Sequence, residues 1–461
     1  MKIKKDPVII SAPDPAFELP ETVKKYLTKY NTDNHWTVEA DNTGFINNVV
    51  VVPAICEFNN IKSLLTSLTV IDNDYFKTTL FLFVINNSTD HCDEIKTDNK
   101  NSLQLLRNII FKNTGDKFIE DIIKSGLRIA VIDASTEGNE LPENNAGAGL
   151  ARKIGMDLAL TVFNYKTSSK KILICLDADC SVEKNYLTEI VENFNNRNIS
   201  AAVIKYSHSE SGDPDTERAI TCYEIFLNYY ELGLKLALSP YAFHSIGSTI
   251  ACDYESYIKV EGMNKKKAGE DFYFLEKLIK NVKVEKIITT VVHPAPRISW
   301  RVPFGTGPRI SRFLNNVQNE YLLYNPISFF ILRDWLEVFL YGDDLTADEY
   351  LKKAGLIDNT LHNFLRSQKF GESWNKISAN SSGIEQRQKQ KILWFDGFRT
   401  LKLIHYLRDN EYNQINMFDA LDKILGELKI DFPARKGKMI PDIRIQKEYL
   451  NILKTSIENL N

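Results

Sequence analysis

The stretch Lys171-Ile-Leu-Ile-Cys-Leu-Asp177-Ala-Asp179-Cys180 determines how the rest of the chain is interpreted. An apolar run at 172–176 between lysines and an aspartate predicts a short strand covered on both faces. Residues i and i+2 of an extended backbone point the same way, so the Asp177 and Asp179 carboxylates should face one spot beyond the strand. Ligands of open α/β sheets bind at such strand ends, and a hard divalent cation relieves the repulsion between two carboxylates. The alternative is that the aspartates only cap a helix at 182–194.

Composition limits the classes of protein to which the chain can belong. With 461 residues it is too long for one ordinary domain, and 43% hydrophobic residues are enough for a sizeable core. A net charge of −3 argues against general nucleic-acid binding. Six cysteines without paired spacing, and a start that does not read as a signal peptide, favour a reducing, cytoplasmic setting.

Hydrophobic segments are too short to span a bilayer, because no window reaches 18 uncharged apolar residues. The segment 327–341 has one apolar helical face, which is typical of a core helix. The alternative is a surface that docks on a membrane, so we expect a protein that is cytoplasmic or peripheral at the inner face of the membrane.

Strand and helix patterns alternate along the first half of the chain. A polar arm at 1–46, with a helix at 21–30, precedes strands at 47–53, 79–85 and 127–132 with helices between them. Such an alternation predicts a parallel sheet with right-handed crossovers. Further strands are expected at 201–206, 245–252 and 287–292.

Charged residues mark three more places where chemistry is expected. Arg152 lies one turn into a helix that begins near Gly149, from where it could reach a diphosphate or a nucleotide base. Glu270 and Asp271 begin another helix, where acidic residues are favoured by the helix dipole; in a cleft, one of them would serve as a general base. His293, at a strand end, is either an ordinary loop residue or a third ligand for Mn²⁺.

A glycine-containing loop at 305–307 lies between two arginines. Arg301 and Arg309 could present guanidinium groups to a diphosphate there. Beyond residue 315 the strand signals stop and helical faces follow, with a polar stretch at 373–390 that predicts a mobile loop. We therefore expect an arm at 1–46, a main domain at 47–314 and a helical C-terminal region at 315–461.

Taken in order over residues 47–310, these motifs resemble a family 2 type glycosyltransferase of the GT-A fold. The matching stretches are Val50-Val-Val-Pro53-Ala54-Ile-Cys-Glu57, Ile85-Asn86-Asn87-Ser88-Thr89-Asp90, Gly149-Leu-Ala-Arg152, Leu176-Asp177-Ala178-Asp179 and Glu270-Asp271. The resemblance implies an α/β fold with a mixed, mostly parallel sheet flanked by helices. The family's Gln-x-x-Arg-Trp element is missing, which argues against a processive synthase.

The resemblance also implies a role for each matching residue. Asp179, helped by Asp177 and with His293 completing the site, would hold Mn²⁺ or Mg²⁺ on the donor diphosphate. Asp271, beside Glu270, would deprotonate the acceptor hydroxyl if the reaction inverts the anomeric centre; a retaining reaction stays open. The residues expected to contact the nucleotide sugar are Pro53, Glu57, Asn87, Arg152, Asp177, Arg301 and Arg309.

The expected function is therefore a hexosyltransferase-like glycosyltransferase that is metal dependent. Its partners would be a nucleotide-diphospho-sugar donor and an acceptor that is a sugar, a lipid-linked molecule or another small molecule. One alternative is a sugar-phosphate nucleotidyltransferase, but that class carries a basic, glycine-rich loop after the first strand, where this chain has Pro53-Ala-Ile-Cys-Glu57. The other alternative is a non-catalytic GT-A-like scaffold.

Overall fold

A computed structural model of the chain describes residues 8–10, 19–30, 35–41, 44–298, 305–435 and 437–460. The chain divides into two compact units. The first comprises Met1–Glu210, Ser245–Pro296 and Trp300–Phe304, and the second comprises Ser211–His244, Arg297–Ser299 and Gly305–Asn461. The second unit thus includes residues 211–244, which lie within the predicted main domain at 47–314.

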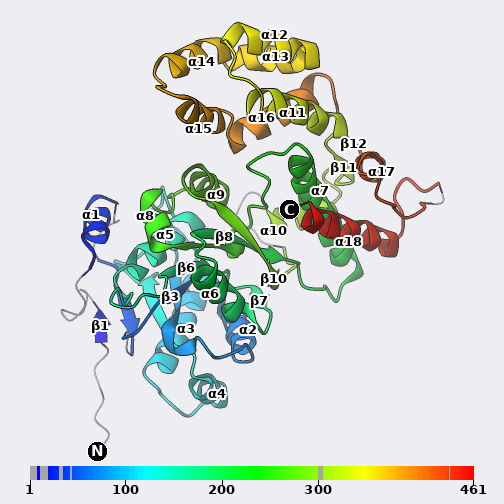
Figure 1. Cartoon of the computed structure of the whole chain (residues 1–461). Helices are drawn as coiled ribbons and strands as arrows, with labels where there is room; N and C mark the ends of the chain where they lie inside the picture. The colour runs from blue at the N-terminus through cyan, green and yellow to red at the C-terminus, as the bar shows by residue number, and fades with distance from the viewer. Residues whose placement is uncertain are drawn as a thin grey trace, which may run out of the picture. The chain divides into compact units, whose positions relative to one another are not determined.

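The first unit contains a 10-stranded mixed sheet, as far as the described residues show (Figure 1). In spatial order its strands are β1 (Val8–Ile10), β2 (Val38–Ala40), β5 (Ile129–Ala134), β4 (Thr79–Asn86), β3 (Asn48–Ala54), β6 (Ile172–Cys175), β9 (Ile250–Asp253), β8 (Ala201–Tyr206), β10 (Val284–Pro294) and β7 (Cys180–Val182). The four neighbours β5, β4, β3 and β6 are parallel. Their carboxyl ends therefore meet at one edge, as the alternation of strands and helices predicts.

Two strands in the middle of this sheet have almost continuous apolar sequences because both of their faces are covered. Val50 and Val52 of β3 and Phe81 of β4 pack in a cluster with residues of α2, α3, α4 and α6. On the opposite face α5 lies very close, since a Cβ at Gly155 would come within 2.4 Å of Val51 Cγ1. Strands buried on both faces are the reason for the unbroken valine run.

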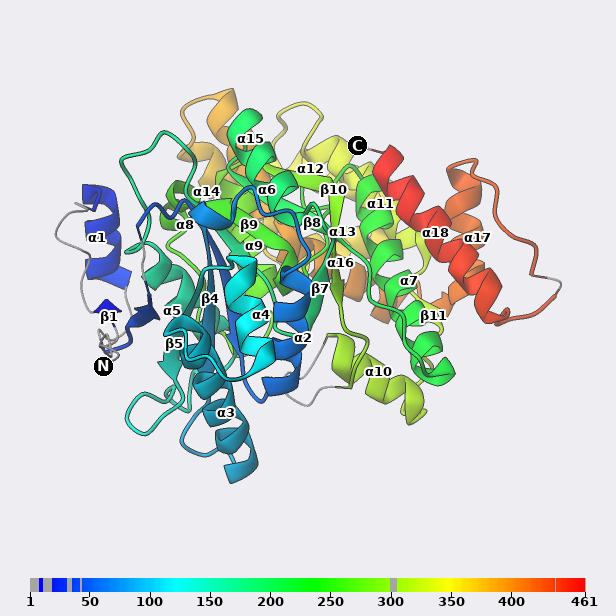
Figure 2. The same cartoon turned by 90° about the horizontal axis from the view of Figure 1, so that it is seen from below.

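The helices of the first unit connect these strands. They are α1 (Glu21–Tyr30), α2 (Phe58–Leu68), α3 (Asp93–Ile110), α4 (Lys117–Ser125), α5 (Ala148–Ala159), α6 (Tyr186–Asn196), α8 (Tyr254–Lys259) and α9 (Glu270–Asn281), with short 3₁₀ turns η1 (Phe76–Thr78) and η2 (Gly247–Thr249). Figure 2 shows α2 and α4 in front of the strands. The predicted helix at 182–194 is displaced, because residues 180–182 form β7, which pairs with β10, and α6 begins only at Tyr186.

The N-terminal arm joins this sheet rather than only packing on it. Its helix α1 covers the predicted residues 21–30. Strand β2 pairs antiparallel with β5, Glu39 lying opposite Val131, and β1 pairs with β2. The arm therefore extends the edge of the sheet beyond β5.

The second unit is helical apart from a two-stranded ladder in its described residues. Its elements are α7 (Pro214–Leu236), α10 (Thr306–Leu314), β11 (Leu322–Leu323), α11 (Pro326–Phe339), α12 (Ala347–Ile357), α13 (Asn359–Ser367), α14 (Phe370–Ala379), α15 (Ile384–Trp394), α16 (Gly397–Asn410), β12 (Ile415–Asn416), α17 (Met417–Glu427) and α18 (Ile443–Asn459). Helix α18 lies alongside α7 (Figures 1 and 2). This packing explains why α7 groups with the C-terminal helices.

The core of the second unit is aromatic. Trp335 and Phe339 of α11 stack with ring centroids 5.0 Å apart, and Trp374 of α14 lies 5.3 Å from Phe339. The apolar face of the segment 327–341 is thus a core face. The prediction of a mobile loop at 373–390 is wrong, because this stretch belongs mainly to α14 and α15, and α14 is anchored by the buried Trp374. Among the described residues no helix is long and apolar enough to cross a membrane.

Candidate functional site

The site begins where β3 and β4 end, and a buried asparagine of α3 joins the two ends. Asn99 Nδ2 donates to the Asn86 carbonyl at 3.0 Å and to Asn87 Oδ1 at 2.7 Å. Asn99 Oδ1 accepts from the backbone N–H of Cys56 at 3.0 Å. Cys56 has a φ of 55°, an uncommon conformation for a residue other than glycine. Asn99 therefore fixes the loop after β3 and the end of β4 in one arrangement.

The side chain of Asn87 forms hydrogen bonds with other groups of the protein. Its side chain donates to the Ser88 and Ser135 carbonyls, each at 3.2 Å, besides accepting from Asn99. The residue is only 1% exposed. In this arrangement Asn87 connects the end of β4 to the end of β5, and its amide faces protein groups.

Pro53 and Glu57 lie on the same edge. Pro53 is partly buried in β3, and Glu57 is buried directly before α2, where its carboxylate accepts from Asn60 Nδ2. The first N–H of α2, from Phe58, donates to Asp98 Oδ1 of α3 at 3.0 Å. Helix α3 thus holds the loop after β3 through both Asp98 and Asn99.

Arg152 of α5 is the centre of the charged part of the site. Its guanidinium donates from one nitrogen to Asp177, after β6, and from another to Glu270, at the start of α9. It is held in place by η2, because a Cβ at Gly247 would lie 2.5 Å from Arg152 Nη2. Burial lowers the pKa of Arg152, but Asp177 and Glu270 outweigh burial and raise it above its ordinary value. Arg152 is therefore a fixed positive charge that binds two of the predicted functional carboxylates.

Asp271 follows Glu270 in the first turn of α9 and is partly buried. Burial, followed by the charge of Glu270, raises the pKa of Asp271 from 3.8 to about 7. Arg152 opposes this shift, as does the Phe272 N–H, which donates to Asp271 Oδ1 at 2.7 Å. A carboxyl with a pKa near neutrality suits a group that must accept and release a proton.

Asp179 and His293 come together through β7 and β10. His293 lies opposite Ser181, and the Ala295 N–H donates to the Asp179 carbonyl at 3.1 Å. Asp179 lies in the turn directly before β7, so this hydrogen bond places the turn beside the strand that carries His293. The His293 ring nitrogens lie 2.8 Å from the Ser207 carbonyl and 2.8 Å from Glu183 Oε1. Both nitrogens thus already face oxygen atoms of the protein.

The carboxylates after β6 have the chemistry of a hard-cation site. Asp177 and Asp179 are both partly exposed, the Asp177 side chain to 35%, and they offer the oxygen ligands that Mg²⁺ and Mn²⁺ prefer. Among the described residues, no three His, Cys, Asp or Glu side chains form a group that could hold a metal. A cation bound by these two carboxylates would therefore need further ligands from outside the described residues.

Two of the residues predicted to contact the donor remain to be placed. Arg301 lies outside the described residues. Arg309 is part of α10 in the second unit, where it pairs with Glu320 and lies 4.2 Å from the centroid of the Phe226 ring. Their contacts with a donor stay predictions.

Comparisons with known proteins give structural likenesses only. No protein-family model matches the chain, and no curated protein matches it. Among solved structures, S. aureus TarS 1-349 in complex with UDP-GlcNAc is 14% identical, with 84% of this chain and 93% of that chain covered at a TM-score of 0.35. Mannosyltransferase PcManGT from Pyrobaculum calidifontis, in complex with GDP-Man and Mn²⁺, is 12% identical, with 84% and 90% covered at a TM-score of 0.34.

A third similar structure is glucosyl-3-phosphoglycerate synthase from Mycobacterium tuberculosis. It is in complex with Mn²⁺, UDP-glucose and phosphoglyceric acid, and it is 15% identical. The comparison covers 61% of this chain and 81% of that chain at a TM-score of 0.32. At these identities and TM-scores the likenesses assign no substrate and no residue role to this chain.

Proposed function

We propose that this chain is a glycosyltransferase that uses a nucleotide-diphospho-sugar donor and a divalent cation. The observation that carries the proposal is the cluster of Arg152, Asp177, Glu270 and Asp271 at the carboxyl end of β6. A cluster of this kind combines a fixed positive charge, carboxylates able to bind a hard cation, and a carboxyl whose pKa lies near 7. Ligands of open α/β sheets bind at such an edge.

In this proposal Asp271 is the base. It takes the proton from an acceptor hydroxyl while that oxygen bonds to the anomeric carbon of the donor. The bond from the anomeric carbon to the diphosphate breaks, and the nucleoside diphosphate leaves with the electron pair, so the reaction inverts the anomeric centre. A divalent cation held by Asp179 and Asp177 would supply positive charge to the leaving diphosphate.

In this proposal Arg152 and Glu270 act on other side chains of the site rather than on the substrate. Arg152 fixes the direction of the Asp177 side chain, and it holds Glu270, whose charge helps to keep the pKa of Asp271 near 7. The predicted contact between Arg152 and the nucleotide would therefore require Arg152 to leave one of its two carboxylates. We assign it a positioning role.

A thermal-shift screen tests the proposal without knowledge of the acceptor. UDP, GDP, CDP and dTDP are each added with and without Mn²⁺ to the native protein, to Asp179→Ala and to Asp121→Ala, a control in which an exposed aspartate of α4 is changed. A ligand at about 100 times its Kd stabilises the folded state by about 2.7 kcal/mol. We expect one nucleotide to raise the midpoint only with Mn²⁺, in the native protein and the control but not in Asp179→Ala. If no nucleotide raises the unfolding midpoint, the result favours the alternative of a non-catalytic GT-A-like scaffold.

A further inference from the structure

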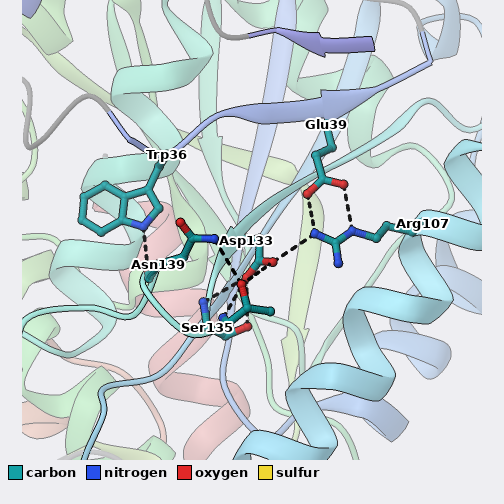
Figure 3. A network of polar contacts seen from close by, with 7 residues as sticks. Trp36, Glu39, Arg107, Asp133, Ser135 and Asn139 are labelled. Carbon is teal, nitrogen blue, oxygen red and sulfur yellow. Dashed lines mark hydrogen bonds and ion pairs between the residues drawn. The ribbon is translucent and has the colours of Figure 1, made fainter. Parts of the chain in front are cut away.

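The loop 135–141, between β5 and α5, is tied to the N-terminal arm by a network that none of the proposed steps uses. Figure 3 shows this network. Trp36, two residues before the start of β2, donates from Nε1 to the Asn139 carbonyl at 2.7 Å. Within the loop the Asn139 N–H donates to the Thr136 carbonyl at 2.8 Å, and Asn139 Nδ2 lies 3.1 Å from Thr136 Oγ1. The arm thus holds the far end of the loop.

A second connection holds the near end of the loop (Figure 3). Glu39 of β2 accepts two hydrogen bonds from Arg107 of α3, at 2.8 and 2.6 Å, and Arg107 Nη2 also donates to Asp133 of β5 at 3.0 Å. Asp133 Oδ1 then accepts from the backbone N–H groups of Ser135 at 3.1 Å and Thr136 at 3.0 Å. Paired charges with two parallel bonds are among the stronger contacts in proteins.

The loop fixed in this way leads directly to the candidate site. The Ser135 carbonyl accepts from Asn87 Nδ2 at 3.2 Å, and the Leu141 N–H donates to the Asn87 carbonyl at 2.8 Å. Asn87 in turn bonds to Asn99, which holds Cys56. A continuous chain of contacts therefore runs from the arm to the loop after β3.

The position of the loop identifies the part of a ligand that it would touch. The carboxylates lie after β6, and the loop 135–141 follows β5, which is separated from β6 by β3 and β4. Neighbouring strands are ~4.8 Å apart, so the three spacings span about 14 Å. Strand β9, on the other side of β6, runs antiparallel to it, so the shared edge of carboxyl ends continues from β6 toward β3, β4 and β5. We expect a nucleoside whose diphosphate lies at β6 to follow that edge.

We propose that the arm, through Trp36 and Glu39, positions the loop 135–141 as a wall of the nucleoside subsite. The proposal rests on the function proposed above, and it makes Trp36 and Glu39 positioning residues rather than catalytic ones. An arm variant lowers the fraction of molecules whose loop is correctly placed, and the apparent Kd rises by the inverse of that fraction. The diphosphate end of the site, after β6, is unaffected.

Isothermal titration calorimetry of three variants tests the proposal. Trp36→Phe removes the donor to Asn139, and Glu39→Gln removes the charge that binds Arg107. Asp41→Asn is the control, because Asp41 follows β2 and forms an exposed ion pair with Lys112 at 3.4 Å. The probes are inorganic pyrophosphate with Mn²⁺ and each of UDP, GDP, CDP and dTDP with Mn²⁺.

We expect the Kd of the nucleoside diphosphate that binds the native protein to rise about three- to tenfold in Trp36→Phe and Glu39→Gln, the range of one lost hydrogen bond. The Kd of pyrophosphate should stay unchanged, and Asp41→Asn should match the native protein for both probes. Amide hydrogen exchange at 135–141 should become faster in the two arm variants.

Three results would overturn the proposal. Equal nucleoside diphosphate affinity in the native protein and both arm variants refutes the positioning role and leaves the proposed function intact. An equal loss of pyrophosphate affinity shows a general structural defect instead. If the native protein binds none of the four nucleotides, the proposal falls together with the proposed function.

Discussion

Replacing Asp271 by Asn should change how the stability of the first unit depends on pH. Burial and the neighbouring Glu270 charge raise the pKa of Asp271 from 3.8 to about 7 in the folded protein. Between these two values the folded protein holds a proton that the unfolded chain has released. The free energy of unfolding therefore falls by ~1.4 kcal/mol for each pH unit across this window. This contribution is fully present below the unfolded pKa and is lost as the pH rises through about 7.

The expected magnitude follows from this window. The rise of the Asp271 pKa by about 3 units corresponds to a change in the free energy of unfolding of at most about 4 kcal/mol. About 2–3 kcal/mol of this change falls between about pH 5 and about pH 8. Asparagine carries no proton to release, so the Asn variant lacks this decline. The stability of Asp271→Asn relative to the native protein should rise by this amount from about pH 5 to about pH 8.

Native-state hydrogen exchange of the amides in β3 and β4 measures the stability of the first unit by itself. Asp93→Asn is a matched control, because Asp93 is an exposed aspartate in the first turn of α3. A difference between Asp271→Asn and the native protein that stays constant across the pH range would refute the assignment of a raised pKa. The same variant should lose donor turnover, because Asp271 is proposed to act on the acceptor. Its affinity for the nucleoside diphosphate should match that of the native protein below about pH 7, where native Asp271 is also uncharged.

Two further substitutions test how the site is held together. Asn99→Ala removes the acceptor of the Cys56 N–H and the donor to the Asn86 carbonyl, so it should destabilise the first unit by about 2–4 kcal/mol and weaken nucleotide binding. Asn101→Ala, at an exposed position of the same helix, should change neither quantity in denaturation and titration experiments. Gly149→Ala should cost about 1–3 kcal/mol in urea denaturation, because its Cβ would lie 2.3 Å from the Lys266 carbonyl oxygen. Gly355→Ala, whose Cβ would have its nearest neighbours at 3.9 Å, should stabilise α12 by up to about 1 kcal/mol.

The central strands could be predicted from sequence because their signal is local. Runs such as Val49–Val52 are short, apolar and β-branched at every position, as expected for a strand buried on both faces. Strands β2 and β7 were not predicted, because each has three residues and forms through pairing with a distant strand, β5 or β10. The mobile loop predicted at 373–390 failed for a related reason, since polar composition did not reveal that Trp374 is buried in an aromatic core.

The candidate site shows the same division between local and distant information. The motif residues after β3, β4 and β6 share an edge because parallel strands end together, and this could be predicted. The pairing of Arg152 with Glu270, 118 positions away, could not. The structural role of Asn99 was not predicted, although its spacing from apolar residues in the sequence indicates a buried position. Ile95, Asn99 and Leu103 are spaced by four residues on the buried face of α3.

The charges around Arg152 connect the raised pKa of Asp271 with the proposed need for a cation. Asp177, Glu270 and Asp271 all act on Arg152, so when all are ionised the net charge of this group is 1 − 3 = −2. A nucleoside diphosphate brings more negative charge to the same edge. Its binding should therefore depend on a divalent cation, and this dependence should be stronger above about pH 7, where Asp271 is ionised, than below it. Protonation of Asp271 and binding of a cation are two ways of relieving the same excess of negative charge.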